Sequence, residues 1–327
     1  MCLQIFTGKI QYKVGNKMRK IVMLERDNIG EDVDLSYFEN LGELTVYGTT
    51  EYEQVKERIG DAEVLVINKI PMNEATLAEA EHVKLICVTA TGTDNVDMEY
   101  CAGRGIAVKN VRSYSTESVV QHTFAMLFYL YEKLRFYDDY VKDGEYIKCP
   151  RFTYFGETFH ELSGKTWGIV GLGEIGARVA DIAKAFGCKV IYYSTSGKNS
   201  NANYERVDFD TLLEESDIVS IHAPLNEQTK HLFTYDVFEK MKESAYLLNL
   251  GRGPIVKEDD LYRALTENLI AGAGLDVLEK EPMSPDNPLF KLKDSRKILI
   301  TPHIAWATTE ARSRLMENVY RNIEENK

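Results

Sequence analysis

A glycine-rich turn near the middle of the chain constrains the fold more than any other feature of the sequence. The turn is Gly171-Leu172-Gly173-Glu174-Ile175-Gly176. It follows a strand-like run at 166–170, opens a helix-like run at 177–186 and precedes a second strand-like run at 189–193. The glycine pattern alone is a weak signal, but in this order of elements it predicts a dinucleotide-binding unit. The alternative is a glycine-rich turn of an α/β fold that binds nothing.

Each glycine of the turn has its own expected task. Gly171 permits the tight turn, Gly173 lets the backbone approach a pyrophosphate, and Gly176 lets the helix pack on the strand. The helix N-terminus, with Glu174 and Ile175, supplies unpaired N–H groups and the positive end of the helix dipole to the phosphates.

The residues after the second strand bear on the choice of cofactor. NAD-dependent enzymes usually carry a carboxylate there, which accepts hydrogen bonds from the ribose hydroxyls. This chain has Ser194, followed by Thr195, Ser196, Gly197 and Lys198. Hydroxyls and a lysine could hold the 2′-phosphate of NADP, and they could equally bond a bare ribose. The pattern slightly favours NADP and leaves NAD open.

Strand-like apolar runs alternate with helix-like segments along most of the chain. The runs before the glycine turn are 20–24, 44–47, 64–68, 85–89 and 106–109. The runs around and after it are 167–171, 189–193, 218–223, 245–250, 272–277 and 298–301. Such strands separated by helices predict parallel sheets buried on both faces. One long helix is expected from Ser115, whose hydroxyl would cap it, to about Val141, and another over 308–326.

Composition excludes several classes of protein. The 327 residues carry a formal net charge of −12, and 44% of them are hydrophobic. The length argues for two domains, and the apolar content supports a packed core. The acidic balance argues against non-specific binding to nucleic acid. The longest apolar run, 123–131, is far too short to cross a membrane.

The cysteines and the N-terminus lead to two further expectations. The five cysteines are widely spaced and form no Cys-x-x-Cys pair. This pattern predicts free thiols in a reducing cytoplasm, and neither a disulfide scaffold nor a metal site. Residues 1–17 carry three lysines and no acid, and Met18 directly precedes a strand-like run. The hypothesis is that the functional chain starts at Met18 and that 1–17 are an N-terminal extension.

Three later segments place reactive side chains after strand-like runs, where open α/β sheets bind their ligands. The segments are Asn249-Leu250-Gly251-Arg252-Gly253, Gly274-Leu275-Asp276-Val277-Leu278-Glu279-Lys280-Glu281-Pro282 and Thr301-Pro302-His303-Ile304-Ala305-Trp306-Ala307. Arg252, Glu281 and His303 are candidates for an acid–base site. Singly, each has a structural alternative: a surface ion pair, a solvated loop acid and a buried hydrogen-bonded histidine.

From Met18 onward, the chain resembles the D-isomer-specific 2-hydroxyacid dehydrogenase family. The resemblance rests on these three segments, in this order and spacing, beside the glycine turn. Residues 68–69, 90–97, 114–122 and 303–307 with 310–312 look most like the glycerate dehydrogenase, or hydroxypyruvate reductase, branch of the family. Ala305-Trp306 departs from the commoner Gly-Gly or Gly-Ser of the family and agrees with that branch.

The resemblance implies two doubly wound domains with a cleft between them. A flavodoxin-like substrate domain would span 18–114 and be completed by 305–327. A Rossmann domain that binds NAD or NADP would span 115–304. A homodimer is also implied, formed through the cofactor domains and the segment 115–141.

The resemblance also implies a role for each reactive side chain. Arg252 would hold the substrate carboxylate and polarise the keto oxygen, a task that suits a planar guanidinium. His303 would protonate that oxygen, because histidine titrates near working pH. Glu281, directly before the proline and preferred to Glu279, would hydrogen-bond the other ring nitrogen and orient the ring. Asp276 would accept a hydrogen bond from the nicotinamide carboxamide.

The full set of expected contacts follows. The expected cofactor contacts are Gly171, Gly173, Glu174, Ile175, Gly176, Ser194, Thr195, Lys198, His222, Ala223, Pro224, Leu250, Gly251, Arg252, Asp276, His303 and Ala305. The expected substrate contacts are Lys69, Thr91, Gly92, Arg252, His303 and Trp306. His122 is expected to pack or cap within its helix.

The leading hypothesis is an oxidoreductase that reduces a small 2-keto acid, such as hydroxypyruvate or glyoxylate, to D-glycerate or glycolate. Another D-2-hydroxyacid dehydrogenase, of the D-lactate or short phosphoglycerate type, is the first alternative. The second is a cofactor-sensing interaction protein that resembles the corepressors of this fold.

Overall fold

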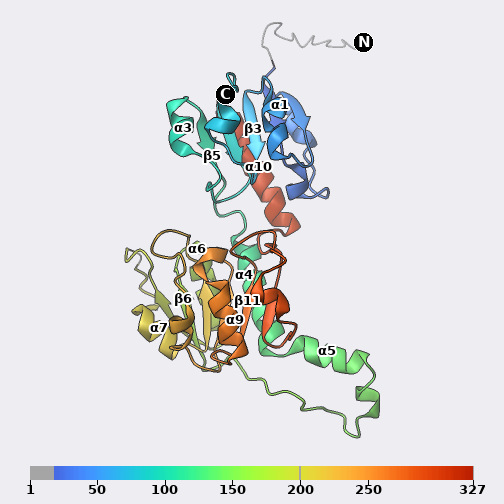
Figure 1. Ribbon diagram of the computed structural model, residues 1–327, viewed down its shortest axis with the longest axis vertical. Coiled ribbons are helices and arrows are strands. Elements are labelled where there is room, and N and C mark those ends of the chain that lie inside the picture. The colour runs from blue at the N-terminus through green and yellow to red at the C-terminus, as the bar shows by residue number, and fades with distance from the viewer. Residues whose placement is uncertain (1–17, 199, 327) are drawn as a thin grey trace, which may run out of the picture. The chain divides into compact units, whose positions relative to one another are not determined.

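The computed structural model describes residues 18–198 and 200–326, which divide into two compact units (Figure 1). Unit 1 comprises 18–114 with 312–326, and unit 2 comprises 115–311. The chain returns to unit 1 at Arg312, so that 305–311, expected in the first domain, lie in unit 2. The hypothesis about 1–17 concerns residues outside the described ones.

Unit 1 is built on a five-stranded parallel sheet. Its strand order is β2-β1-β3-β4-β5, the order of flavodoxin-like folds. The strands are β1 (Lys20–Met23), β2 (Glu43–Val46), β3 (Val64–Ile67), β4 (Leu85–Val88) and β5 (Ala107–Lys109). Every residue of β3 and β4 is buried, as expected for central strands covered on both faces.

Short helices and one long helix cover this sheet. They are η1 (Arg26–Ile29), η2 (Ser36–Leu41), η3 (Tyr52–Gln54), α1 (Val55–Ile59), α2 (Glu74–Leu77), α3 (Met98–Gly103) and α10 (Thr309–Glu325). The α10 helix, expected over 308–326, packs its Tyr320 ring 5.3 Å from that of Tyr37 and 5.7 Å from that of Phe38. The C-terminal helix thereby closes the core of the N-terminal domain.

Unit 2 contains a seven-stranded parallel sheet in the order β12-β11-β10-β9-β6-β7-β8. The strands are β6 (Thr166–Val170), β7 (Lys189–Tyr193), β8 (Glu205–Arg206), β9 (Ile218–Ile221), β10 (Tyr246–Asn249), β11 (Gly272–Leu275) and β12 (Ile298–Ile300). The order reverses between β6 and β9, as in a Rossmann fold. The predicted pair of doubly wound α/β domains is confirmed, and only β8, two exposed residues, was not expected.

Helices cover both faces of this second sheet (Figure 1). They are α4 (Thr116–Tyr131), α5 (Leu134–Lys142), α6 (Glu174–Ala185), α7 (Phe209–Glu215), α8 (Tyr235–Phe238) and α9 (Glu258–Thr266), with η4 (Tyr146–Lys148), η5 (Gly253–Ile255) and η6 (Pro288–Lys291). Neighbouring strand residues point to opposite faces, so Ile169 joins a core with α4 and α6, whereas Val170 joins a core with α7, α8 and α9.

The single long helix expected from Ser115 to Val141 is wrong. Lys133 has a left-handed backbone (φ 57°), and its Nζ donates to the hydroxyl of Tyr246 at 2.7 Å, so α4 ends at Tyr131 and α5 starts at Leu134. Ser115 does not cap α4 with its side chain. The break separates a helix buried on the sheet from α5, which has no buried residue. None of the helices in the described ranges is long and apolar enough to cross a membrane.

Candidate active site

The site residues expected in unit 2 follow the carboxyl ends of its parallel strands. Gly171 follows β6, Ser194 follows β7, His222 follows β9 and Asp276 follows β11. These strands all belong to one parallel sheet, so their carboxyl ends lie along one edge. That edge, at the reversal of strand order, is where open α/β sheets bind ligands.

The glycine turn has the geometry that the sequence predicts. Gly171 has a φ of +92°, and a Cβ on it would lie 2.9 Å from the backbone of Ala223. A Cβ on Gly176 would lie 2.3 Å from the carbonyl oxygen of Gly171, so only glycine lets α6 pack so closely. A Cβ on Gly173 would meet open space. Gly171 and Gly176 therefore serve packing, whereas Gly173 leaves the N-terminus of α6 open to a ligand.

Ala223 lies between two close-packed turns. Besides Gly171, it faces Gly251, whose Cβ would lie 2.9 Å from the Ala223 carbonyl oxygen. Ala223 and Leu250 are buried, and the exposed Pro224 accepts the Thr229 hydroxyl at its carbonyl, 2.7 Å away. These expected cofactor contacts lie on the closely packed turns that follow β6, β9 and β10.

Two polar atoms on either side of the glycine turn are buried without a hydrogen-bond partner among the described residues. They are the hydroxyl oxygen of Ser194, a residue only 4% exposed, and Nδ1 of His222. Buried polar groups are nearly always paired in folded proteins, and leaving one unpaired is costly. Their positions after β7 and β9, which flank β6, fit a polar ligand on the glycine turn.

His222 contacts the hydroxyl of Ser220 through Nε2. Trp167 Nε1 donates to the Ser220 hydroxyl at 2.9 Å, and that hydroxyl lies 3.1 Å from His222 Nε2. The Ser220 hydroxyl can donate to Nε2 or accept from it as well, so Nδ1 faces the ligand side as an acceptor or as a donor according to the tautomer. Burial lowers the pKa of His222 to about 3, so the ring is neutral at working pH.

The loop after β7 is polar and partly basic. Thr195 is partly buried and Lys198 is exposed. Arg206, from β8, donates to the Gly197 carbonyl at 3.0 Å and so lies against the same loop. Arg206 was not predictable from the sequence, because β8 has no apolar pattern that would place it beside β7.

His303 and Glu281 form a direct pair. His303 Nδ1 lies 2.7 Å from Glu281 Oε2, and the other carboxylate oxygen accepts the backbone N–H of Leu278 at 2.9 Å. His303 has a left-handed backbone (φ 56°). Its Nε2 has no hydrogen-bond partner within the described ranges. A carboxylate on one ring nitrogen leaves the other available for proton transfer.

Glu279 is engaged elsewhere. Its Oε1 accepts the backbone N–H of Glu258 at 2.8 Å, and its own N–H donates to Glu258 Oε1 at 2.6 Å. Asn287 also donates to Glu258, at 2.6 Å. This reciprocal pair anchors the segment that leads to Glu281.

Asp276 holds the loop that carries His303. Its Oδ1 accepts the Thr301 hydroxyl at 2.6 Å and the N–H of Ile304 at 2.9 Å, and Oδ2 accepts the N–H of Ala305 at 2.9 Å. The carboxylate is 2% exposed. The sequence predicts a cofactor contact for Asp276 but not this anchoring of the loop, because the partners of Asp276 lie on the loop after another strand.

The loop is fixed from two further sides. His122 Nε2, on α4, lies 3.0 Å from the Thr301 hydroxyl oxygen, and the Ala305 carbonyl accepts the Ser118 hydroxyl. His122 therefore joins two elements, beyond the packing or capping role expected for it. Trp306 is partly buried against the core beside α4.

Arg252 lies on a turn that packs against the approach to Glu281. Its Nη1 donates to the Gly251 carbonyl at 3.0 Å. Asn249 accepts the N–H of Gly251 at 3.1 Å and donates to the Arg252 carbonyl at 3.0 Å, which fixes the turn. A Cβ on Gly253 would lie 1.8 Å from the Leu278 carbonyl oxygen. The Arg252 turn and the segment before Glu281 are thus in backbone contact.

The substrate contacts expected in unit 1 lie after its central strands. Lys69 follows β3, and Thr91 and Gly92 follow β4. The Thr91 hydroxyl donates to the Val111 carbonyl at 3.0 Å, and Lys69 donates its backbone N–H to Glu25. No group of three or more His, Cys, Asp or Glu side chains in the described part of the chain could hold a metal ion.

Comparisons with known proteins agree with this arrangement. The family model described as D-isomer specific 2-hydroxyacid dehydrogenase, NAD binding domain, matches residues 124–305. A hydroxypyruvate reductase of Blautia hydrogenotrophica is 37% identical over 313 residues, which cover 94% of this chain and 96% of that protein.

Two solved structures share the fold. The first is an acyclic imino acid reductase in complex with NADPH and D-Arg, with a TM-score of 0.82 and 29% identity over 94% of this chain and 96% of that one. The second is a D-lactate dehydrogenase from Aquifex aeolicus complexed with NAD and lactic acid, with a TM-score of 0.80 and 29% identity over 94% of this chain and 95% of that one.

Proposed function

Because the chain belongs to the D-isomer-specific 2-hydroxyacid dehydrogenase family, it is a nicotinamide-dependent oxidoreductase, and we propose that it reduces hydroxypyruvate or glyoxylate to D-glycerate or glycolate. The observation that carries the proposal is the 2.7 Å contact between His303 and Glu281 at the carboxyl edge of the unit 2 sheet. The 37% identity to a hydroxypyruvate reductase supports the choice of substrate.

The cofactor would lie on the glycine turn. Gly173 and the N-terminus of α6 would hold its phosphates, and the unpaired Ser194 hydroxyl and His222 Nδ1 offer polar contacts on either side. When bound, the nicotinamide supplies or accepts the hydride. Thr195, Lys198 and Arg206 favour NADP over NAD, because they set hydroxyls and cations beside Ser194 with no carboxylate at that position.

The side chains of the protein bind the substrate, transfer the proton and orient the histidine. Arg252 binds the substrate carboxylate, for which a planar guanidinium offers two parallel donors. His303 Nε2 gives a proton to the keto oxygen during reduction and takes it back during oxidation. Glu281 holds Nδ1 and thereby aims Nε2. We also expect Lys69 and the backbone of Thr91 and Gly92 to contact the substrate carboxylate, and Trp306 to border the substrate.

The experiment that tests this proposal follows the absorbance of NADH and NADPH, each with hydroxypyruvate, glyoxylate, pyruvate and a branched 2-keto acid. Fast oxidation with hydroxypyruvate or glyoxylate supports the proposed substrates. Fast oxidation with pyruvate alone supports the second candidate, a D-lactate dehydrogenase, which the structural likeness to that enzyme favours. Folded protein that binds the cofactor but oxidises it with none of the four acids would contradict the proposed substrates and favour another keto acid or the cofactor-sensing alternative.

Two matched variants test the acid–base pair. Glu281→Gln keeps the shape of the side chain but removes its charge from His303, and we expect kcat to fall about 100-fold, within the range of general acid–base effects. Glu279→Gln makes the same change two residues away, where the amide oxygen can still accept the Glu258 N–H and the backbone N–H is unchanged, and we expect kcat within about threefold of wild type. An equal fall of kcat in both variants would contradict the role of Glu281 as the partner that orients His303.

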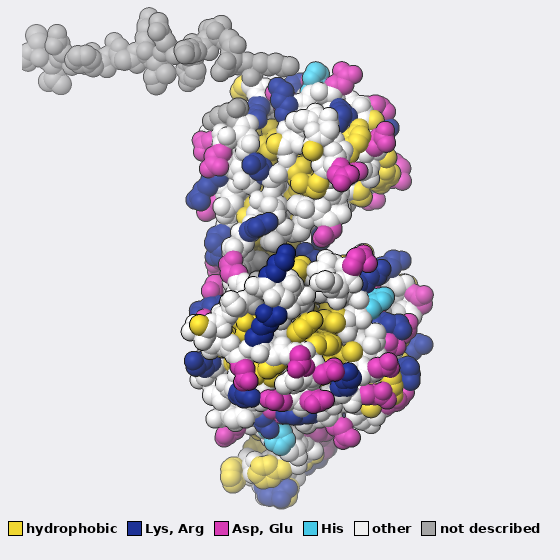
Figure 2. Space-filling view, turned by 90° about the vertical axis from the view of Figure 1, so that its left-hand side faces the viewer, with side chains coloured by type: hydrophobic (Ala, Val, Ile, Leu, Met, Phe, Trp, Pro, Cys, Tyr) yellow, Lys and Arg dark blue, Asp and Glu magenta, His cyan; other side chains and the backbone are white. Residues whose placement is uncertain are grey.

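A homodimer is also proposed. The loop after α5 exposes large apolar side chains, with Ile147 88% and Phe152 91% exposed. Figure 2 shows hydrophobic side chains at the lower tip of unit 2, where Figure 1 places this loop. Exposed apolar patches of this kind mark interfaces. The occupant proposed is a second copy of this chain.

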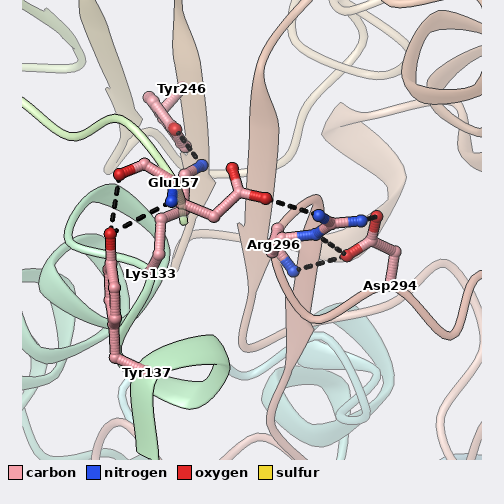
Figure 3. A network of polar contacts seen from close by, with 6 residues as sticks. All are labelled: Lys133, Tyr137, Glu157, Tyr246, Asp294 and Arg296. Carbon is pink, nitrogen blue, oxygen red and sulfur yellow. Dashed lines mark hydrogen bonds and ion pairs between the residues drawn. The ribbon is translucent and has the colours of Figure 1, made fainter. Parts of the chain in front are cut away.

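The loop after α5 is anchored to unit 2 by hydrogen bonds and ion pairs at Glu157, as expected for a loop that binds a partner in one conformation. The Tyr137 hydroxyl donates to the Glu157 carbonyl at 2.6 Å, and Arg296 pairs with the carboxylates of Glu157 and Asp294 (Figure 3). A hollow of about 280 Å³ beside these residues is lined by Phe136, Asp139, Tyr140, Asp143, Glu145, Ser295 and Arg296.

A further inference from the structure

A buried glutamate in unit 1 receives three consecutive backbone amides. Glu25 follows β1 and is 9% exposed. Its Oε2 accepts the N–H of Asn68 at 2.6 Å, of Lys69 at 2.9 Å and of Ile70 at 3.2 Å, and its Oε1 lies 3.0 Å from the Lys69 nitrogen. The carboxylate thus grips the backbone of the turn that follows β3.

The charge of Glu25 is stabilised by these amides. Within residues 18–198 and 200–326, no lysine or arginine side-chain nitrogen lies within 4.0 Å of its carboxylate. Asn28 adds one side-chain N–H at 3.2 Å. A buried carboxylate is costly unless hydrogen bonds satisfy it, and charge-assisted bonds are about twice as strong as neutral ones. The turn at 68–70 is therefore held in one conformation.

Further hydrogen bonds connect the turn at 68–70 to the turn after β4. The Asn68 side chain donates to the Thr89 carbonyl at 2.8 Å and to the Thr89 hydroxyl oxygen at 2.9 Å, and that hydroxyl donates to Ile67 at 3.0 Å. Thr89 stands two residues before Thr91. One buried carboxylate thus connects the turns that carry Lys69, Thr91 and Gly92.

We propose that Glu25 is a positioning residue for the substrate carboxylate. By fixing the turn at 68–70, and through Asn68 the start of the turn at 89–92, it aligns the groups of unit 1 that meet the keto acid. In this proposal Glu25 acts through the backbone of these turns. The inference rests on the proposed function, because it assumes that Lys69, Thr91 and Gly92 bind that carboxylate.

The test is Glu25→Gln. The amide keeps the length of the side chain but turns an NH₂ group toward backbone N–H donors that need an acceptor. We expect KM for the keto acid to rise about tenfold, with kcat and the cofactor Kd, followed by fluorescence, within about twofold of wild type. Hydrogen exchange at the amides of 68–70, followed by mass spectrometry, should become faster.

A matched control separates positioning from general weakening of unit 1. Glu51 is exposed and also accepts a backbone N–H, at the start of η3. Glu51→Gln is expected to leave KM, kcat and exchange at 68–70 unchanged. If Glu25→Gln does not fold, Glu25→Asp keeps the charge but withdraws it by one methylene, and a KM rise of about threefold or more is expected.

The outcomes are distinct. A folded Glu25 variant with unchanged KM, or with a lower kcat at unchanged KM, overturns the positioning role. An equal rise of KM in Glu51→Gln overturns it as well. Failure of the proposed function shows first in the wild-type protein, which would turn over none of the keto acids, and this inference would fall with it.

Discussion

The Thr301 hydroxyl donates to Asp276 across 2.6 Å, and so the loops after β11 and β12 are joined by a hydrogen bond to a buried charge. Because the hydrogen of Thr301 goes to Asp276, the oxygen of Thr301 accepts from His122 Nε2, 3.0 Å away. The chain of contacts from α4 to Asp276 ends at the backbone of Ile304 and Ala305. These contacts fix the backbone directly after His303, and so they fix the position of His303 itself.

Asp276→Asn tests whether this carboxylate anchors the loop or binds the cofactor. An amide would turn an NH₂ group toward at least one of its donors, and the His303 loop would loosen. We expect kcat to fall tenfold or more, with the Kd of the cofactor within about threefold of wild type. A large rise in cofactor Kd at unchanged kcat would instead support a contact with the nicotinamide carboxamide. Thr301→Ser, which keeps the hydroxyl, is the control and should stay near wild type.

The glycine turn allows ligand binding to be separated from packing. Gly173→Ala places a methyl in open space, so the melting temperature should stay within about 2 °C, while the methyl obstructs the phosphates and raises the cofactor Kd about tenfold or more. Gly176→Ala drives a methyl to 2.3 Å from the Gly171 carbonyl oxygen and should lower the melting temperature markedly. Calorimetry with and without cofactor measures both. If Gly173→Ala bound the cofactor with unchanged affinity, the cofactor phosphates would not bind at this turn.

His222 predicts how stability changes with pH. Burial lowers its pKa from the usual 6.5 to about 3, so between these values the unfolded chain binds a proton that the folded chain does not. Its contribution to stability is therefore present above pH 6.5 and is lost as the pH falls toward 3, by at most about 1.4 kcal/mol per pH unit.

Urea unfolding at pH 7, 6 and 5 measures this effect. His222→Gln should lose less stability over that range than wild type does, whereas His82→Gln, at an exposed position in unit 1, should keep the wild-type slope. Parallel slopes for wild type and His222→Gln would show that the buried ring does not set the acid sensitivity.

The fold was predictable from sequence where the signal is local. Central strands of parallel sheets are continuous apolar runs, and each expected run overlaps a strand of the structure. β8 was not predicted, because Glu205 and Arg206 are both exposed at a sheet edge. The end of α4 was not predicted either, because the left-handed Lys133 is stabilised by Tyr246, 113 positions away.

The site was predictable in its residue types and less so in its connections. A histidine and an acid before a proline suggest a pair from their resemblance to the family, and the structure joins Glu281 to His303. The anchoring by Asp276, His122 and Glu25 depends on residues that meet only when separate loops converge. The spacing of residues within one segment does not show which other loop that segment contacts.

Phe152→Asp tests the proposed homodimer. Phe152 is 91% exposed on the loop after α5, and a charge there should be tolerated by the monomer but not in an apolar interface. Phe290→Asp, at a 57% exposed position on η6, is the matched control. Light scattering should give about twice 37.3 kDa for wild type and the control, and close to 37.3 kDa for Phe152→Asp. A wild-type mass of one chain would refute the dimer, and a Phe152→Asp protein that keeps the dimer mass would place the interface elsewhere on the chain.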